Sequence, residues 1–291
     1  MSFCFTIFTI FFRRTRTYIM KNVSSIEPLH YKHTGLAEPR TNDSPVVLIH
    51  GLLGMGRNLG ALARSLADDY SILSVDLLNH GRSPRTDVMD FTLLANSVVN
   101  LLTDLGIAKA HFIGHSLGGK VAMTIALNYP DQTDKCIIAD IAPVTYAPEH
   151  NDLFALLSAI DLSQYRQRAE LQAHLTKQLK DASVIQLLLQ NLKRSRTGWQ
   201  WQMHLPAIIA SYDALREGIH LPENGQQANC PCLFLCGGQS HYWRDEYEVQ
   251  ARKLFSFAQF HTIASASHWL HIERPEQFNT KVADFLAFAD D

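Results

Sequence analysis

The chain has 291 residues, of which 46% are hydrophobic and 19% charged, a composition typical of a globular protein with one large domain or two small ones. The formal net charge of −2 provides no basic surface to neutralise phosphates, which argues against a nucleic-acid partner. Five cysteines, an odd number, argue against a secreted disulfide scaffold and favour a reducing compartment, so we expect a cytoplasmic protein.

Residues 1–25 allow two interpretations. The apolar run at residues 3–12 is too short to span a bilayer, which takes about 20 apolar residues. Its arginines follow the run instead of preceding it, unlike a secretory signal. Because no acidic residue precedes Glu27, the segment could be a presequence that targets an organelle. We favour the other interpretation, in which the true start is Met20 and the earlier residues are a mis-assigned leader.

Apolar strands and amphipathic helices alternate in the first half of the chain. Strands are predicted at residues 29–31, 45–50, 71–76, 110–113 and 135–141, and helices at residues 59–66, 91–105 and 120–129. The run at 45–50 is almost wholly apolar, as in a strand buried on both faces of a sheet. This alternation predicts parallel strands joined by crossover helices.

The sequence Gly-x-Ser-x-Gly, with Ser116 at its centre, lies between a predicted strand and a predicted helix. At such a sharp turn the serine takes a strained, exposed position, and Gly114 and Gly118 let neighbouring backbone pass close by. Ser116 would then lie above a helix N-terminus whose free N–H groups can stabilise an oxyanion. The alternative is a glycine-rich turn that merely contains a serine, which the flanking strand and helix disfavour.

Residues 148–227 break the alternation, and no strand is predicted there. Helical periodicity recurs at residues 153–160, 169–179, 184–192 and 207–215. The pattern then resumes with strands at 232–236 and 259–264 and helices at 246–254 and 275–288. An all-helical insertion between two parts of a parallel sheet is expected to cover the active site, and its apolar stripes indicate a cleft that accepts an acyl group.

Four motifs in this order resemble those of a known family. They are HGLLG at 50–54, NHGRSP at 79–84, GHSLGGK at 114–120 and SHW at 267–269. Together they are similar to the α/β-hydrolase superfamily, and more narrowly to the small acyl esterases typified by bacterial YbfF and their mitochondrial relatives. ADIAP at 139–143 and LLLQNL at 187–192, followed by GWQW at 198–201, strengthen the narrower likeness, which extends from about residue 30 onward. Leu78 departs from it, since relatives often carry arginine there.

The resemblance implies an α/β-hydrolase fold. This fold has a mostly parallel sheet of the eight-stranded type with helices on both of its faces. Here a helical cap is expected after strand six of that fold, which is the strand predicted at residues 135–141. We expect residues 26–146 and 228–291 to form the core and residues 147–227 the cap.

Ser116 is the predicted nucleophile, and it needs a histidine within hydrogen-bond reach to take its proton. Among 14 histidines, His268 follows the last strand and fits the order Ser, acid, His of α/β hydrolases. In that fold the acid usually follows strand seven, which corresponds to the strand predicted here at residues 232–236. After it this chain has Asp245 before a helix, in a capping position. Asp140 at the end of strand six is the other candidate. YbfF-like esterases are similar in placing the acid there, with a serine matching Ser240, and we favour Asp140.

Backbone N–H groups of Leu52 and Leu117 are expected to form the oxyanion hole. The residues expected to contact the substrate in the cleft are Trp199, Trp201, Ser240 and Tyr242. No phosphate-binding loop, dinucleotide fingerprint or His-Glu-x-x-His occurs, so no cofactor is expected. Cys230, Cys232 and Cys236 lie on one strand face and are interpreted as core residues, so no metal site is expected either.

These observations predict an enzyme, a serine hydrolase that cleaves short-to-medium acyl esters or thioesters through a Ser-His-Asp acyl-enzyme mechanism. Its partner is then a small-molecule acyl substrate, with no nucleic acid and no stable membrane insertion. Ester against thioester preference and oligomeric state stay open. C–C bond hydrolysis or a lyase reaction on the same fold is one alternative. A non-catalytic binding protein is another, and it would predict a broken triad.

Overall fold

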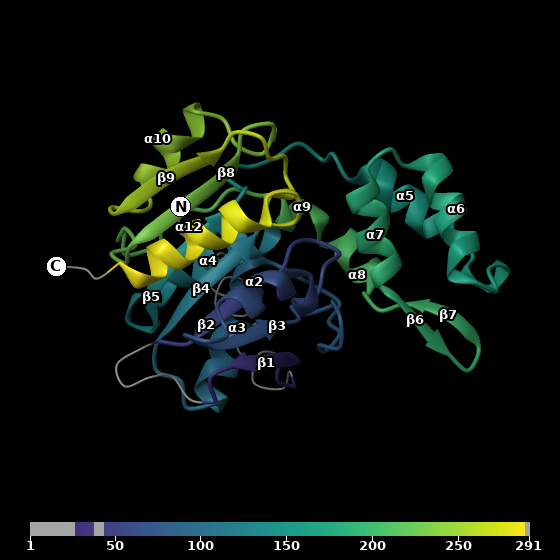
Figure 1. Ribbon diagram of the computed structural model, residues 1–291, viewed down its shortest axis with the longest axis horizontal. Helices are drawn as coiled ribbons and strands as arrows, with labels where there is room; N and C mark the ends of the chain where they lie inside the picture. Colours follow the sequence, from purple (N-terminus) through teal and green to yellow (C-terminus); the bar gives the residue numbers. More distant parts are fainter. Residues whose placement is uncertain (1–26, 38–43, 289–291) are drawn as a thin grey trace, which may run out of the picture.

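A computed structural model describes residues 27–37 and 44–288, so the predicted leader over residues 1–25 lies outside the described part. Its main sheet has the strand order β1-β3-β2-β4-β5-β8-β9 (Figure 1). The strands are β1 Tyr31–Gly35, β2 Val46–Ile49, β3 Ser71–Val75, β4 Ala110–His115, β5 Thr133–Ala139, β8 Cys232–Gly237 and β9 Ala258–Ile263. Among the described strands of this sheet, only the β1–β3 pair is antiparallel, which confirms the mostly parallel sheet. Within the described residues the sheet has seven strands, where the eight-stranded type was expected.

Helices cover both faces of this sheet. They are α2 Gly60–Ser65, α3 Phe91–Asp104, α4 Leu117–Asn128, α10 Glu246–Arg252, α11 Leu270–Glu273 and α12 Pro275–Ala287, with 3-10 turns at Gly56–Leu59 and Pro130–Gln132. Alternate residues of β2 point to opposite faces, so Val47 and Ile49 pack in the cluster with α3 and α4. Val46 and Leu48 pack in the cluster with α2 and α12. Strand β2 is therefore apolar along its whole length because both of its faces are buried.

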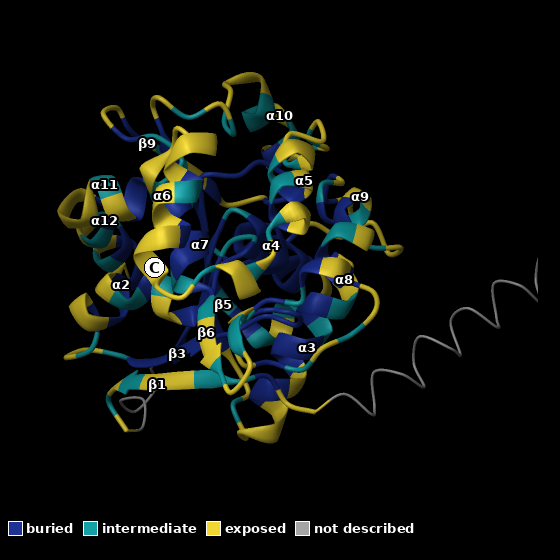
Figure 2. Cartoon of the chain, turned by 90° about the vertical axis from the view of Figure 1, so that its right-hand side faces the viewer, coloured by how far each residue is buried: buried dark blue, intermediate teal, exposed yellow. Residues whose placement is uncertain are grey.

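The cap lies between β5 and β8 and projects to one side of the core (Figure 1). Its helices are α5 Asn151–Ala159, α6 Arg168–Gln178, α7 Ala182–Gln190, α8 Leu205–Ala210 and α9 Tyr212–Leu215, with a 3-10 turn at Leu162–Gln164. Their outward faces are largely exposed, whereas buried residues gather around α4 and the sheet (Figure 2). A sheet with helices on both faces and an inserted cap is the arrangement that the sequence predicted.

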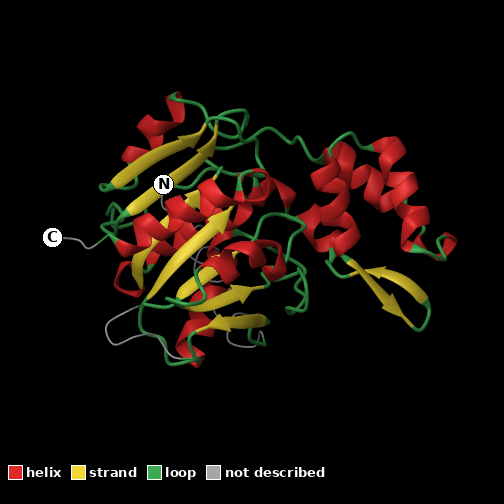
Figure 3. Cartoon of the chain, viewed as in Figure 1, coloured by secondary structure: helices red, strands yellow, loops and turns green. Residues whose placement is uncertain are grey.

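The cap is not wholly helical, and that expectation is wrong. Strands β6 (Leu192–Ser195) and β7 (Gly198–Trp201) form an antiparallel hairpin at its far end (Figure 3). Gly198 takes a φ of 124°, a conformation that glycine allows where the chain reverses. The Arg194 guanidinium lies 5.0 Å from the Trp199 ring centre across the two strands. Strands of four residues are too short to show the two-residue period in the sequence.

Hydrogen bonds attach the cap to the carboxyl edge of the sheet. The Asn191 side-chain amide donates to the Leu53 carbonyl at 2.5 Å, and the His204 N–H donates to the Asn79 carbonyl at 2.7 Å. The Met89 N–H donates to the hydroxyl of Ser211 at 2.8 Å. The cap is thus held against the loops that follow β2 and β3. None of the described helices has the length and apolar character needed to cross a membrane.

Lys120 joins the two ends of the cap to helix α4. Its side chain is buried at 2% exposure, and burial lowers its pKa to about 7. The Lys120 Nζ donates to the Val144 carbonyl at 2.8 Å, where the chain leaves the core. It also donates to the carbonyl of Arg216 at 3.3 Å and to that of Glu217, where the chain returns. The Lys120 amine therefore holds together the two segments that connect the core with the cap, and it does so one helical turn after Ser116.

We predict that Lys120→Met lowers the free energy of unfolding by about 2 to 4 kcal/mol, because three carbonyls lose a buried donor. Urea unfolding followed by circular dichroism measures this change. Lys109→Met is the matched control: its amine lies 3.1 Å from Asp134 and is half exposed, so its loss is expected to cost less than about 1 kcal/mol. Equal effects of the two substitutions would contradict the role given to Lys120.

Candidate active site

Ser116 lies at a sharp turn between β4 and α4. Its backbone has φ 52° and ψ −118°, in a region that residues with side chains rarely adopt. The Ser116 N–H donates to the Ala139 carbonyl at 2.9 Å, and its carbonyl accepts from the Gly119 N–H at 2.8 Å. These two bonds hold the serine in its strained conformation at the carboxyl edge of the sheet.

Two glycines make this turn possible because there is no room for a side chain at either position. A Cβ at Gly114 would lie 2.0 Å from the Gly118 carbonyl oxygen. A Cβ at Gly118 would lie 2.2 Å from the Ile49 carbonyl oxygen. Both glycines of the Gly-x-Ser-x-Gly motif therefore serve close backbone packing between β4, α4 and β2.

Asp140 follows β5 directly and is fully buried, with φ 53°. Its Oδ1 accepts from the Gly237 N–H at 2.7 Å, and its Oδ2 accepts from the Ser240 hydroxyl at 2.5 Å. The His268 Nδ1 lies 2.7 Å from the same Oδ2. A carboxylate in this position has three donors, which compensate for the loss of solvent around its charge.

His268 is oriented by this carboxylate and by the residue before Ser116. Because Asp140 accepts at Nδ1, the Nδ1 of His268 carries the proton and Nε2 is free to act as a base. The Nε2 of His115 lies 2.8 Å from the His268 carbonyl, so it carries the proton and donates to that oxygen. Asp245, the other candidate acid, is exposed at the N-terminus of α10. The structure therefore brings Asp140, and not Asp245, to His268.

The loop after β2 is held by two buried histidines that the sequence did not single out. The His50 Nε2 accepts from the Leu77 N–H at 3.0 Å, so its Nδ1 carries the proton and donates to Gly51 at 2.8 Å. The His80 Nε2 accepts from the Leu53 N–H at 3.1 Å. The Leu53 N–H is thus engaged, which leaves that of Leu52 as the candidate oxyanion donor in this loop. Leu117 is the first residue of α4, where an N–H has no partner within its own helix.

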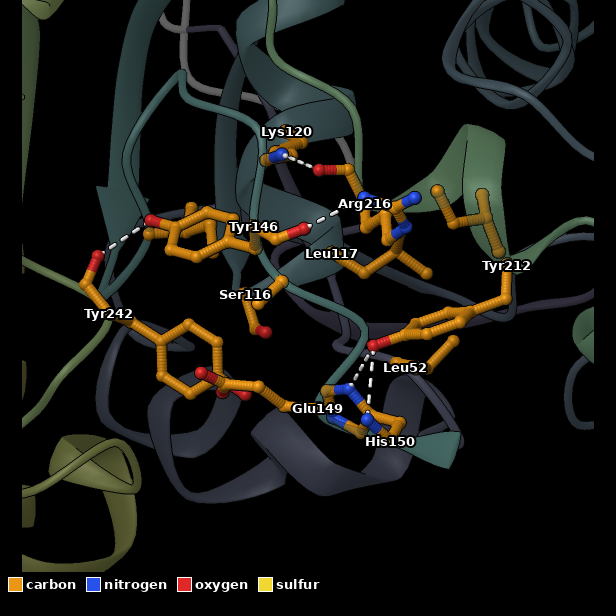
Figure 4. Close-up of a pocket in the computed structure, with 13 residues that line it drawn as sticks. Leu52, Ser116, Leu117, Lys120, Tyr146, Glu149, His150, Tyr212, Arg216 and Tyr242 are labelled. Carbon is orange, nitrogen blue, oxygen red and sulfur yellow. Dashed lines mark hydrogen bonds between the residues drawn. The ribbon is translucent and has the colours of Figure 1, made fainter. Parts of the chain in front are cut away.

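Two cavities meet at Ser116, and Leu52, His150 and Tyr242 also line both of them. The smaller, of about 460 Å³ including space open to solvent, has Leu117, Ile141, Tyr146, Tyr212 and Leu215 in its wall. The larger, of about 670 Å³ on the same measure, is lined by His268, Trp269 and Asp181 and by Leu153, Val184 and Leu187 of the cap. The Ser116 hydroxyl points into the space between Tyr242 and His150 (Figure 4). The nucleophile candidate is thus accessible from two sides.

The four residues expected to contact substrate differ in position. Tyr242 lies in the wall of both cavities, with its ring centre 4.1 Å from that of His268. Ser240 donates to Asp140, so its side chain holds the carboxylate instead of facing substrate. Trp199 and Trp201 belong to the hairpin at the far end of the cap and line neither cavity at Ser116. The apolar pattern of the sequence around these two residues does not indicate how far their side chains lie from Ser116.

In the described part of the chain, the cysteines and other ligand-type side chains form no metal centre. Cys230, Cys232 and Cys236 are buried, and the sulfur atoms of the first two lie 3.7 Å apart. Over residues 27–37 and 44–288, no three His, Cys, Asp or Glu side chains are grouped in a way that could hold a metal ion.

Comparison with known proteins gives concordant matches. A sequence profile described as "alpha/beta hydrolase fold" matches residues 44–275. The chain is 37% identical to "Esterase YbfF" of Escherichia coli (strain K12) over 251 residues, 86% of this chain and 96% of that protein. It is 32% identical to "sn-1-specific diacylglycerol lipase ABHD11" of Mus musculus over 252 residues, 83% of this chain and 80% of that protein. A solved structure titled "Marine microorganism esterase" superposes with a TM-score of 0.83 and 30% identity, over 90% of this chain and all of that one.

The buried histidines around the loop after β2 predict a pH dependence of stability. Burial lowers the pKa of His80 and of His271 from 6.5 to about 3, and it also lowers the pKa of His50. In the unfolded chain these side chains take up a proton near pH 6.5, while in the folded protein they stay neutral. The free energy of unfolding is therefore highest above pH 6.5 and falls as the pH decreases. At pH 5 the expected loss is about 2 kcal/mol from His80 and about 2 kcal/mol from His271.

Urea unfolding at pH 7.5, 6.0 and 5.0 measures this loss. His80→Gln removes one titrating side chain, so its free energy of unfolding is expected to change less steeply between pH 6.0 and 5.0 than that of the wild type. A wild-type stability that is constant from pH 7.5 to 5.0 would contradict the neutral state assigned to these histidines.

Proposed function

The chain belongs to the α/β-hydrolase family and is an ester-hydrolysing enzyme, and we propose that it acts as a serine esterase with Ser116 as nucleophile, His268 as base and Asp140 as acid. The observation that carries this proposal is the 2.7 Å contact between the His268 Nδ1 and the Asp140 carboxylate. His268 lines the larger cavity together with Ser116, which is strained, half-buried and in the wall of both cavities. A base oriented in this way next to a nucleophile is the arrangement that acyl transfer requires.

In the proposed reaction the Ser116 Oγ attacks the ester carbonyl carbon while the His268 Nε2 takes the hydroxyl proton. The negative charge that develops on the carbonyl oxygen is stabilised by the N–H groups of Leu52 and Leu117. His268 then gives the proton to the leaving alcohol oxygen, and the acyl group stays on Ser116. Asp140 keeps the imidazole in the productive tautomer and stabilises its protonated form.

Water completes the cycle. It attacks the acyl-enzyme carbonyl, with His268 taking the proton of the water, and the Ser116 oxygen leaves with that proton while the carboxylic acid is released. Ser240 has a positioning task in this scheme, because its hydroxyl donates to the same oxygen of Asp140 as the imidazole does.

The two cavities suggest where each part of the substrate binds. The proton donor to the leaving group has to reach the leaving oxygen, and His268 lines the larger cavity, so we assign the larger cavity to the leaving group. The acyl group is then assigned to the smaller cavity, whose wall includes Leu117, Ile141 and Leu215. It is the smaller of the two cavities, which favours short-to-medium acyl chains. The names of the relatives, an esterase and a diacylglycerol lipase, support an ester as the substrate.

Ser116→Ala is predicted to lower the hydrolysis of p-nitrophenyl butyrate to background, a loss of about 10⁴-fold or more. Release of p-nitrophenol measures the rate for acetate, butyrate, octanoate and palmitate esters, and the specificity constant is expected to fall for palmitate. Coenzyme A thioesters of the same acids, assayed by thiol release, test whether a thioester is preferred.

Ser256→Ala provides the control, because this exposed serine lines neither cavity and its variant is expected to keep the wild-type rate. Undiminished turnover by Ser116→Ala would overturn the assignment of the nucleophile.

A further inference from the structure

His150 lies in the wall between the two cavities, and the proposed mechanism gives it no task. It stands immediately before α5, at the start of the cap, and it lines both the smaller and the larger cavity. Leu52, Ser116 and Tyr242 are the other residues shared by both walls. A polar side chain at this point is next to the place where the acyl part of a substrate joins its leaving group.

Hydrogen bonds with Tyr212 fix the tautomer of His150 (Figure 4). The Tyr212 hydroxyl accepts from the His150 backbone N–H at 3.2 Å. The same hydroxyl lies 2.7 Å from the His150 Nδ1, and this nitrogen is the acceptor for the hydroxyl proton of Tyr212. The hydroxyl therefore donates to Nδ1. In a neutral imidazole the ring proton is then on Nε2.

The surroundings of the pair favour this neutral, fixed state. Tyr212 is buried and packs edge-on against Phe154, with ring centres 4.9 Å apart. Burial, together with the nearby His268, lowers the pKa of His150 below its ordinary value. His150 is thus a preorganised N–H donor, held by a tyrosine 62 residues away in the chain.

The direction of this donor follows from the two walls. Tyr212 lines the smaller cavity, so the Nδ1 edge of the imidazole faces that side. His150 also lines the larger cavity, whose wall includes His241 and His268, and with Nδ1 engaged by Tyr212 its Nε2 is the ring nitrogen left for that cavity. The exposed His241 has its own partner, since its Nε2 lies 3.1 Å from Glu149. His150 therefore presents an N–H to the cavity assigned to the leaving group.

We propose that His150 recognises the leaving group by donating its Nε2–H to an oxygen atom close to the scissile bond. The preferred leaving groups are then alcohols that carry an ether, hydroxyl or carbonyl oxygen on a neighbouring carbon, as opposed to plain hydrocarbon alcohols. A site with a fixed donor discriminates against a substrate that leaves the donor unpaired. This inference rests on the proposed ester hydrolysis and on the assignment of the larger cavity to the leaving group.

Two butyrate esters of matched shape test the proposal, 2-methoxyethyl butyrate and butyl butyrate, which differ by an ether oxygen in place of a methylene group. The measured quantity is kcat/KM for 2-methoxyethyl butyrate divided by kcat/KM for butyl butyrate at pH 8, from gas chromatography of the released alcohols. We expect His150→Phe to lower this ratio about 3- to 10-fold relative to the wild type. Dividing the variant ratio by the wild-type ratio cancels the difference in intrinsic reactivity of the two esters.

Two further variants sharpen the result. Tyr212→Phe keeps the ring but removes the hydroxyl that fixes the tautomer, so its ratio is expected to fall as well, and it replaces His150→Phe if that variant does not fold. His220→Phe changes an exposed histidine that lines neither cavity and is expected to keep the wild-type ratio.

A wild-type ratio in both His150→Phe and Tyr212→Phe, with p-nitrophenyl butyrate still hydrolysed, would overturn the inference and leave the proposed function intact. No hydrolysis of any ester by the wild type would overturn the proposed function and the inference with it.

Discussion

The arrangement of the candidate site depends on one buried carboxylate. Asp140 has no exposed surface, and its charge is compensated by the Gly237 N–H, the Ser240 hydroxyl and the His268 imidazole. These donors come from the end of β8, from the loop that follows it and from the loop after β9, so the carboxylate at the end of β5 joins segments that are far apart in the chain. Parallel pairing of β5 with β8 and of β8 with β9 brings those segments to the same sheet edge. Replacing one of these donors would leave a buried charge only partly compensated, so the imidazole orientation and the local fold depend on the same contacts.

Backbone strain is concentrated at the same edge. Four residues other than glycine have positive φ: Leu53 at 59°, Asn79 at 64°, Ser116 at 52° and Asp140 at 53°, counted over the described residues. Each follows a strand that ends beneath the cap, and each has hydrogen bonds that hold its conformation. The cap contributes to two of them, through Asn191 to Leu53 and His204 to Asn79. The cap therefore has a structural role, in fixing strained loops, in addition to lining the cavities.

Much of this organisation was predictable from the sequence, and the physical reasons for this also explain which features the sequence could not predict. Buried parallel strands are apolar throughout, so the alternation of strand and helix was readable, and Ser116 was recognisable because both of its flanking glycines are required sterically. The choice between Asp140 and Asp245 depended on which strand end faces His268, and this follows from strand pairing that no local pattern contains. The hairpin at β6 and β7 was missed because each strand has four residues. The contact of His150 with Tyr212 joins residues 62 positions apart, so no sequence spacing indicates it.

The central claim, that Asp140 orients His268 to activate Ser116, is tested most directly by the rate at which a p-nitrophenyl phosphonate labels the enzyme. Peptide mass spectrometry identifies the modified residue, and p-nitrophenol release gives the rate for the wild type, Asp140→Asn and Asp245→Asn. The account predicts a single adduct on Ser116, formed about 10³- to 10⁴-fold more slowly in Asp140→Asn and at the wild-type rate in Asp245→Asn. An adduct on another residue, or slow labelling in Asp245→Asn with a wild-type rate in Asp140→Asn, would contradict it.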